Sequence, residues 1–495
     1  MSATLVFDDL VRDAATLRER GARLAGGLYR LGVREGDVIA LLLRNGPAFA
    51  DVMFACRTAG VYFAPLNWHF TSEEIAYIAR DCGARVAIGD ADLLDAAADA
   101  FPSGTTILGL DAAGRFTDYE TWLAQQAPYD GPHVAPRGHF QYTSGTTGRP
   151  KGVRRDPVPL AEVDARQDVM RNVVRAAYGI EDGCRTLVSA PLYHSAPSSI
   201  AQNTLLYGSL LVLARRFDAA ETLALIDRHR IEVAYLTPTM YVRLLRLPDD
   251  VWARYDGSSL RFVASTGSPC APDVKRAIIE RLGPVVNETY ASTEAGTITI
   301  ASSADALAKP GTAGLPIGDA RVRILDEHGA DCPPRVVGTI YARQPTYADF
   351  TYQNLPDARR AMERDGLLTL GDVGYLDEDG YLFVCDRSVD MVLSGGVNVY
   401  PAEIEHAMLR IRGVLDCAVV GIPDAEYGER LHAFVQPDPG ASLDADTLRS
   451  ELRRLVAGFK VPRSFTFTDA LPRDDNGKVA RRRLRAAATA TVATA

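Results

Sequence analysis

The chain of 495 residues lacks the usual markers of secreted and metal-stabilised proteins. Its seven cysteines are scattered, odd in number and never spaced as C-x-x-C. Such a set provides neither a disulfide framework nor a zinc site. The eight histidines show no ligand spacing either. We therefore expect reduced thiols and no structural metal centre.

Long apolar runs and an excess of positive charge are also missing. No apolar stretch approaches the roughly 20 residues that cross a bilayer. The first residues include Asp8 and Asp9 and lack the apolar core of a signal peptide. The formal net charge is −9, whereas a nucleic-acid or anionic-membrane partner requires a basic face. We expect a cytoplasmic protein with no membrane span and no nucleic-acid partner.

The sequence does contain alternating strand-like and helix-like segments through its first three quarters. This alternation predicts an α/β architecture with parallel sheets. The expected strands Val233–Leu236 and Phe262–Ala264 each run into a polar loop that contains proline or glycine. Ligands of open α/β sheets bind at such carboxyl ends of strands. From about residue 339 the pattern changes, and Asp377–Gly380 between two apolar runs predicts a β-hairpin.

The length of the chain and this change of pattern predict two domains. We expect a large N-terminal domain of several subdomains over residues 1–386 and a small, mobile α+β lid domain over residues 391–485. The charged stretch at residues 387–390 is the expected hinge. The Ala/Thr-rich tail at residues 486–495 is low in complexity, so we expect it to be disordered. The sequence does not indicate the oligomeric state.

The segment Tyr142–Gly152 carries the strongest chemical signal. It reads Y-T-S-G-T-T-G-R-P-K-G, with three glycines, four Ser/Thr hydroxyls and two cations. Glycines let backbone N–H groups approach an anion, and the hydroxyls and Lys151 add donors and positive charge. In the usual P-loop the lysine is followed by Ser or Thr, which is not the case here. In isolation the segment would fit a flexible surface turn equally well.

Five further segments follow it in a fixed order. They are Y-A-S-T-E at Tyr290–Glu294, L-G-D-V-G at Leu370–Gly374, D-R at Asp386–Arg387, S-G-G-V-N-V-Y-P-A-E-I at Ser394–Ile404 and L-P-R-D-D-N-G-K at Leu471–Lys478. In this set and order the chain resembles the adenylate-forming superfamily of acyl-CoA synthetases, adenylation domains and luciferases. The resemblance spans about residues 38–484, and Pro191–Ser195 resembles most the branch that handles fatty and other bulky acids.

The resemblance implies a ligase that uses ATP, Mg²⁺ and coenzyme A. Such an enzyme joins a carboxylic acid to AMP, releases pyrophosphate and transfers the acyl group to a thiol. Glu294 would bind Mg²⁺, Thr293 would contact the α-phosphate, and Asp372 would accept hydrogen bonds from the ribose hydroxyls. The residues that the resemblance implies for ATP and coenzyme A are Thr143, Ser144, Gly145, Thr146, Thr147, Gly148, Lys151, Gly267, Ser268, Tyr290, Ala291, Ser292, Asp372, Arg387, Ser394, Gly395 and Gly396. Tyr290 would stack on the adenine.

Two further residues are implied for the acid itself. Lys478 would bridge the substrate carboxylate and the α-phosphate, although its turn-rich surroundings alone would suit a solvated surface lysine. His194 would line the acyl site, although a lone histidine is more often structural. Amino-acid-activating relatives commonly carry an aspartate in this region, and Tyr193–Ser199 contains no carboxylate. We therefore expect a hydrophobic fatty or bulky polycyclic or aromatic acid.

Three positions depart from the pattern of the superfamily. Ala291 replaces a common glycine, Leu370 replaces a frequent threonine, and Val389 stands where a hinge Asp or Lys is usual. A β-branched residue favours extended backbone, so the balance between two domain orientations could change. Alternatives to the acyl-CoA synthetase are therefore a stand-alone enzyme that loads a carrier-protein thiol, an enzyme competent in only one half-reaction and an adenylate-binding regulator without turnover. The sequence does not name the acid or the pathway.

Overall fold

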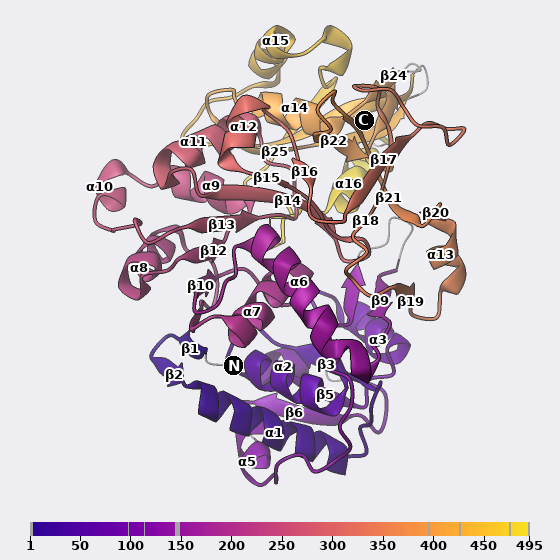
Figure 1. The fold of residues 1–495 in the computed structure, drawn as a ribbon. Helices are drawn as coiled ribbons and strands as arrows, with labels where there is room; N and C mark the ends of the chain where they lie inside the picture. Colours follow the sequence, from indigo (N-terminus) through magenta and orange to yellow (C-terminus); the bar gives the residue numbers. More distant parts are fainter. Residues whose placement is uncertain are drawn as a thin grey trace.

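The computed structural model has a large α/β N-terminal part and a smaller C-terminal unit (Figure 1). It describes residues 3–97, 99–112, 114–143, 149–394, 397–424, 427–474 and 477–493. The expected fold class is confirmed. Among these residues, no helix is both long and apolar enough to cross a membrane.

A nine-stranded sheet forms the centre of the N-terminal part. Its order is β16 (Leu315–Pro316), β15 (Gly296–Ala301), β14 (Val286–Ser292), β13 (Phe262–Ser265), β12 (Val233–Tyr235), β10 (Arg185–Val188), β11 (Leu210–Leu213), β1 (Thr4–Phe7) and β2 (Leu10–Arg12). The strands from β14 to β1 pair in parallel. They are short, apolar and buried, as strands with both faces covered should be.

A second, fully parallel sheet lies beside the first. Its order is β4 (Tyr62–Pro65), β3 (Val38–Leu42), β5 (Val86–Asp90), β6 (Thr106–Leu110) and β7 (Thr117–Asp118). The helices of the N-terminal part are α1 (Ala14–Arg30), α2 (Ala48–Ala59), α3 (Ser72–Asp81), α4 (Ala91–Ala96), α5 (Tyr119–Ala124), α6 (Val163–Tyr178), α7 (Ser195–Tyr207), α8 (Ala219–His229), α9 (Pro238–Leu245), α10 (Asp249–Trp252), α11 (Pro272–Leu282), α12 (Ser303–Ala308) and α13 (Pro356–Ala361), with a 3₁₀ turn at Leu160–Glu162. Of these, α7 packs on β10 and β11, and α11 packs on β14.

Two antiparallel sheets complete the N-terminal part. The three-stranded sheet has the order β19 (Phe350–Tyr352), β9 (Lys151–Arg155) and β8 (Gln141–Thr143). The other comprises β17 (Arg321–Leu325), β18 (Gly338–Arg343), β21 (Leu367–Leu376), β20 (Glu363–Arg364) and β22 (Leu382–Arg387). The pairing of β21 with β22 confirms the predicted hairpin around Asp377–Gly380.

The C-terminal unit is an α+β layer with its own apolar core. Its sheet comprises β24 (Val397–Val399), β23 (Val392–Ser394), β26 (Gly428–Pro437), β25 (Val414–Asp424) and β27 (Ser464–Phe467). Its helices are α14 (Pro401–Met408), α15 (Ala445–Leu455) and α16 (Arg481–Ala493), with a 3₁₀ turn at Gly458–Lys460. Ile404, Met408, Leu448 and Leu452 are fully buried between sheet and helices.

The predicted disorder of the tail is wrong over residues 486–493, which continue helix α16. Leu484 and Ala488, four residues apart, lie on one face of that helix and are buried at 6% and 2% exposure. They pack with Ala418, Val420 and other side chains of the C-terminal sheet. Composition alone suggested low complexity, whereas the four-residue spacing supports an amphipathic helix.

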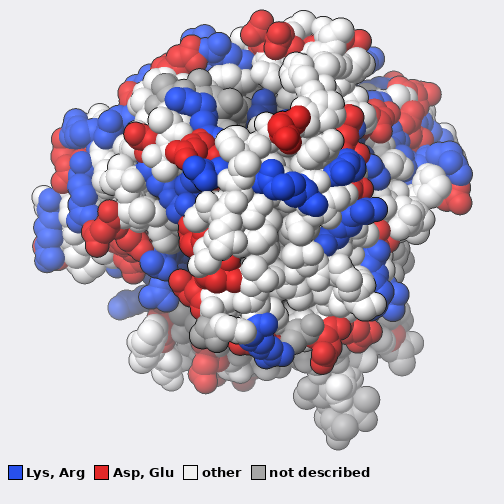
Figure 2. All heavy atoms as spheres, turned by 90° about the horizontal axis from the view of Figure 1, so that it is seen from below, with Lys and Arg blue, Asp and Glu red and all other residues white. Residues whose placement is uncertain are grey.

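The surface is of mixed charge on the face drawn in Figure 2. There, Lys and Arg lie interspersed with Asp and Glu around largely uncharged areas. Such a face offers no broad basic area to a polyanion, in agreement with the net charge of −9.

Candidate active site

Glu294 stands in the turn between β14 and β15 and is only 8% exposed. Its Oε1 accepts a 3.1 Å hydrogen bond from Thr143 Oγ1 and a 3.0 Å bond from the hydroxyl of Tyr352. Lys151 Nζ lies 5.2 Å from the centre of the Tyr352 ring. Three predicted residues, Thr143, Lys151 and Glu294, are thus gathered around a tyrosine that the motifs had not indicated.

A second cluster joins the same hairpin to the neighbouring antiparallel sheet. Tyr290 on β14 donates a 2.7 Å hydrogen bond from its hydroxyl to Asp372 Oδ2. Asp372 and Arg387 face each other across β21 and β22, and Arg387 Nε lies 3.4 Å from Asp372 Oδ1. Burial and the adjacent Asp372 raise the pKa of Tyr290 well above its ordinary value, so the phenol remains a protonated donor at neutral pH.

Lys478 connects the two clusters electrostatically. Its side chain is exposed to solvent but surrounded by protein charges. Desolvation, followed by the nearby Arg387, lowers the pKa of Lys478, whereas Asp474 and, more weakly, Asp390 and Glu294 raise it. The ammonium group therefore lies within electrostatic reach of both Arg387 and Glu294.

His194 and Thr293 both lie at the start of α7. His194 is the residue before this helix, and its Nε2 lies 3.6 Å from Asp474 Oδ2 in the segment that carries Lys478. Thr293 Oγ1 donates a 3.2 Å hydrogen bond to Ser195 Oγ. The N-terminal end of α7 therefore contacts both the lysine segment and the Tyr290–Glu294 motif.

The other predicted residues are distributed as follows. Gly267 (φ 100°) and Ser268 follow the carboxyl end of β13, as expected for a ligand-binding edge. Ala291 and Ser292 end β14, and Ser292 Oγ accepts a bond from the Ala295 N–H. Ser394 pairs with Val397 and Gly428 in the C-terminal sheet, so it belongs to neither cluster. Ser144, Gly145, Thr146, Thr147, Gly148, Gly395 and Gly396 lie outside the described residues.

Two supporting residues were missed by motif reasoning. Tyr352 reaches Glu294 because β19 pairs with β9, a register that no local sequence pattern indicates. Arg155, at the end of β9, donates to the carbonyl oxygens of Thr293 and Glu294 at 2.6 and 3.2 Å. The half-buried Arg155 guanidinium therefore fixes the backbone of the turn that presents the Glu294 carboxylate.

The donor set suits a magnesium–nucleotide complex. Among the described residues, no group of three or more His, Cys, Asp or Glu side chains could hold a metal ion on its own. Mg²⁺ bound to a nucleotide usually takes one or two protein carboxylates and completes its shell with phosphate oxygens and water. A single buried carboxylate, Glu294, beside the cation Lys151 fits that mode. Asp372 and Arg387 add a hydrogen-bond acceptor and a positive charge nearby.

Comparison with known families agrees with this geometry. The sequence profile described as AMP-binding enzyme matches residues 13–349, and the profile of the AMP-binding enzyme C-terminal domain matches residues 403–478. The chain belongs to the adenylate-forming superfamily of AMP-binding enzymes. The resemblance inferred from the six motifs is therefore confirmed, and the chain is an ATP-dependent, AMP-forming ligase.

Individual relatives of this superfamily match along nearly the whole chain. A feruloyl-CoA synthase of Amycolatopsis sp. is 35% identical over 472 residues, which cover 94% of this chain and 91% of that protein. The fatty acid–[acyl-carrier-protein] ligase ScoC of Streptomyces coeruleorubidus is 30% identical and covers 97% of this chain and 91% of its own length. The solved amide bond synthetase McbA from Marinactinospora thermotolerans has a TM-score of 0.84 at 27% identity, covering 98% of this chain and 97% of that one.

Proposed function

We propose that the enzyme activates a hydrophobic fatty or bulky polycyclic or aromatic carboxylic acid with ATP and transfers the acyl group to coenzyme A. The observation that carries the proposal is that Glu294, held by Thr143, shares a hairpin with Tyr290, whose hydroxyl bonds Asp372 beside Arg387. The 35% identity to a feruloyl-CoA synthase supports both coenzyme A as acceptor and an aromatic acid.

The first half-reaction depends on charge neutralisation and orientation. A carboxylate is a poor electrophile, and attachment to AMP provides a good leaving group. Lys478 would hold the substrate carboxylate against the α-phosphate, and Lys151 would hold the outer phosphates. Mg²⁺ bound at Glu294 would supply further neutralisation of phosphate charge. Asp372 would accept from the ribose hydroxyls, with Tyr290 both stacking on adenine and orienting that carboxylate.

The second half-reaction would require a different orientation of the C-terminal domain. In the structure, Arg387 ends β22 and its carbonyl oxygen accepts from the N–H groups of Asp390 and Met391, which forms a tight turn. Val389 in this turn is 48% exposed, so its side chain does not restrain the hinge by packing. We propose that rotation about residues 387–390 withdraws Lys478 and brings the Ser394–Gly396 segment toward the thiol.

The acceptor has one serious alternative, a carrier-protein thiol. The 30% identity of the acyl-carrier-protein ligase ScoC over almost the whole chain favours it. The test is to incubate the enzyme and ATP with a panel of hydrophobic acids and, in parallel, coenzyme A, a phosphopantetheinylated carrier protein or a simple amine. Acyl-CoA formation at least about tenfold faster than the other products is the expected result. Preferential carrier loading or amide formation would reject coenzyme A as the acceptor.

A further inference from the structure

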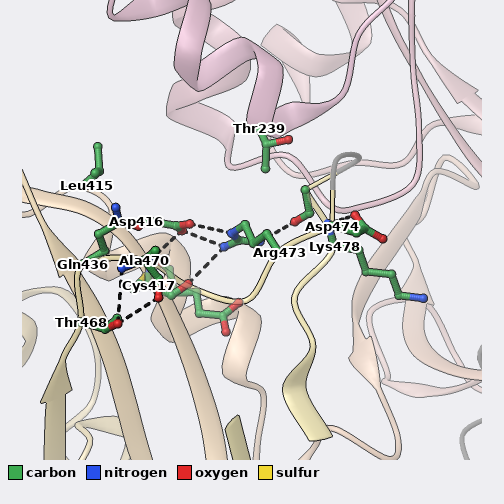
Figure 3. A network of polar contacts seen from close by, with 12 residues as sticks. Thr239, Leu415, Asp416, Cys417, Gln436, Thr468, Ala470, Arg473, Asp474 and Lys478 are labelled. Atoms are coloured by element: carbon green, nitrogen blue, oxygen red, sulfur yellow. Dashed lines mark hydrogen bonds and ion pairs between the residues drawn. The ribbon is translucent and has the colours of Figure 1, made fainter. Parts of the chain in front are cut away.

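Arg473 ties the segment that carries Lys478 to the C-terminal sheet. Arg473 Nε and Nη2 donate to the two carboxylate oxygens of Asp416 at 2.6 and 2.7 Å, which is a bidentate ion pair. Its Nη1 donates to the carbonyl oxygen of Gly477 at 2.6 Å, and Nη2 also reaches the Cys417 carbonyl at 3.3 Å. Figure 3 shows Arg473 between Asp416 and the lysine segment, with the Lys478 side chain extending away on the other side.

Backbone hydrogen bonds also join the residues on the two sides of the turn that precedes Lys478. Arg473 and Val479 form an isolated antiparallel bridge. The Lys478 N–H donates to Asp474 Oδ1 at 2.8 Å, and the Asp474 N–H donates to the Lys478 carbonyl at 3.0 Å. The Gly477 N–H donates to the Asp474 carbonyl at 2.8 Å. The Cα of Lys478 therefore moves with Arg473 as one unit.

The C-terminal sheet positions the carboxylate of Asp416 for its ion pair with Arg473. Asp416 lies on β25, where the pairing with β26 shifts register between Val414 and Asp416. A bulge of this kind re-aims a side chain relative to the regular pleat. Both Asp416 and Arg473 side chains are 24% exposed. The two side chains are thus partly desolvated. The geometry of this ion pair therefore contributes more to holding the segment in place than that of an exposed ion pair would.

We propose that Arg473 is a positioning residue for Lys478 in the adenylate-forming half-reaction, acting through its ion pair with Asp416. The inference rests on the proposed function of Lys478. Lysine has a flexible four-carbon stem, so the position of its Cα decides whether the ammonium reaches the reacting oxygens. Only an arginine can bind both oxygens of Asp416 and the Gly477 carbonyl at once, because its fork presents five donors.

The test separates the two half-reactions in the full-length enzyme. Pyrophosphate exchange into ATP reports the first, and thioester formation from a synthetic acyl-adenylate reports the second. Because misplacement by about 1 Å can cost about 10²-fold, Arg473→Gln and Arg473→Lys are each expected to lower exchange by about 10–100-fold. Thioester formation should change by less than about twofold. Arg454→Gln, which removes an exposed ion pair with Glu451 in the same domain, is the matched control and should change neither.

Two combined variants exclude a merely structural role. Asp416→Asn should reproduce the loss, and Asp416→Asn with Arg473→Gln should lose no more than the worse single variant. In a Lys478→Ala background, Arg473→Gln should cause no further loss of exchange. Equal loss of both half-reactions, additive losses, or unchanged exchange in Arg473→Gln would overturn the inference. Wild-type protein without exchange for any acid would instead reject the proposed function.

Discussion

The hydroxyl of Tyr290 donates a 2.7 Å hydrogen bond to Asp372, the carboxylate expected to hold the ribose. Tyr290 comes from β14 of the central sheet, whereas Asp372 comes from β21 of an antiparallel sheet. A residue predicted only to stack on adenine thus also orients a carboxylate 82 residues away in the sequence. The two roles can be separated experimentally.

Tyr290→Phe keeps the ring and removes the hydroxyl. A hydrogen bond to a charged group contributes about 1.5–3 kcal/mol, so we expect the KM for ATP to rise about tenfold or more, with kcat within about threefold. Tyr381→Phe is the matched control, because the Tyr381 hydroxyl makes a similar 2.8 Å bond to Asp305 outside the site. An unchanged KM for ATP in Tyr290→Phe would mean that this bond does not orient the ribose acceptor.

Lys478→Ala is expected to affect the two half-reactions differently. Removal of one preorganised charge commonly costs about 10²–10³ in rate, so pyrophosphate exchange should fall by that factor. Thioester formation from preformed acyl-adenylate should be largely spared, because the lysine is proposed to have left the site by then. Both rates are measured on the same preparation. Equal loss of both steps would refute this division of roles.

The sequence indicated which residues gather at the candidate site, but not which contacts they make with one another. Six motifs in order predicted Thr143, Lys151, Glu294, Asp372 and Arg387, and the structure brings these into two adjacent clusters. These residues could be selected because each motif is local, and their roles remain predictions. By contrast, contacts that bridge sheets depend on strand register between distant segments, which no single-sequence pattern contains.

Tyr352 and the C-terminal tail illustrate this limit in opposite ways. Tyr352 lies 58 residues from Glu294 and meets it only because β19 pairs beside β9. The tail was expected to be disordered because its Ala/Thr-rich sequence is low in complexity. Leu484 and Ala488 nevertheless suffice to bury one face of α16 against the sheet, since a small residue can fit closely there. The composition of the tail therefore did not indicate that its helix can pack against the C-terminal sheet.

Tyr352→Phe tests the support of Glu294, the carboxylate proposed to bind Mg²⁺. The Tyr352 hydroxyl fixes Glu294 Oε1 at 3.0 Å, so its loss should raise the Mg²⁺ concentration for half-maximal activity by about five- to tenfold. Tyr129→Phe, which removes an exposed hydroxyl contact to the Pro132 carbonyl, is the control. Identical magnesium titrations for the Tyr352→Phe and Tyr129→Phe variants would contradict a role in metal binding.

Gly477→Ala tests the seating of the lysine segment on the N-terminal domain. Gly477 has a φ of 85°, and a Cβ there would lie 2.2 Å from Thr239 Oγ1 on α9. Both strain and collision should hinder seating, so pyrophosphate exchange should fall at least about tenfold. Gly440→Ala shares a positive φ of 82° but meets no described atom within 4 Å, and it should leave exchange nearly unchanged. Similar rates for the two variants would contradict the contact with Thr239.

Asp386 is expected to give the enzyme a pH-dependent stability. Burial, opposed by Arg481 and by the N–H groups of Ala402 and Arg387, raises the pKa of Asp386 from 3.8 to about 6. The folded state therefore binds more protons than the unfolded state between about pH 4 and 6. The contribution of Asp386 to the free energy of unfolding should fall as pH rises through this window, by about 3 kcal/mol in total.

Urea unfolding of wild type and Asp386→Asn at pH 4.5, 5.5 and 7.5 measures this effect. The variant lacks the titrating group, so its stability relative to wild type should increase with pH and level off above about pH 6. Glu451→Gln at an exposed ion pair is the control. A difference between Asp386→Asn and wild type that stays constant with pH, or that decreases, would show that Asp386 does not titrate in this window.

The most direct measurement of the whole account is acid-dependent exchange of labelled pyrophosphate into ATP. Wild-type enzyme with Mg²⁺ and a panel of hydrophobic acids should exchange with at least one of them, and Glu294→Gln should lower that exchange by about 10²-fold or more. No exchange with any acid, from protein whose folding is verified, would contradict the account. Exchange that survives unchanged in Glu294→Gln would contradict the site described.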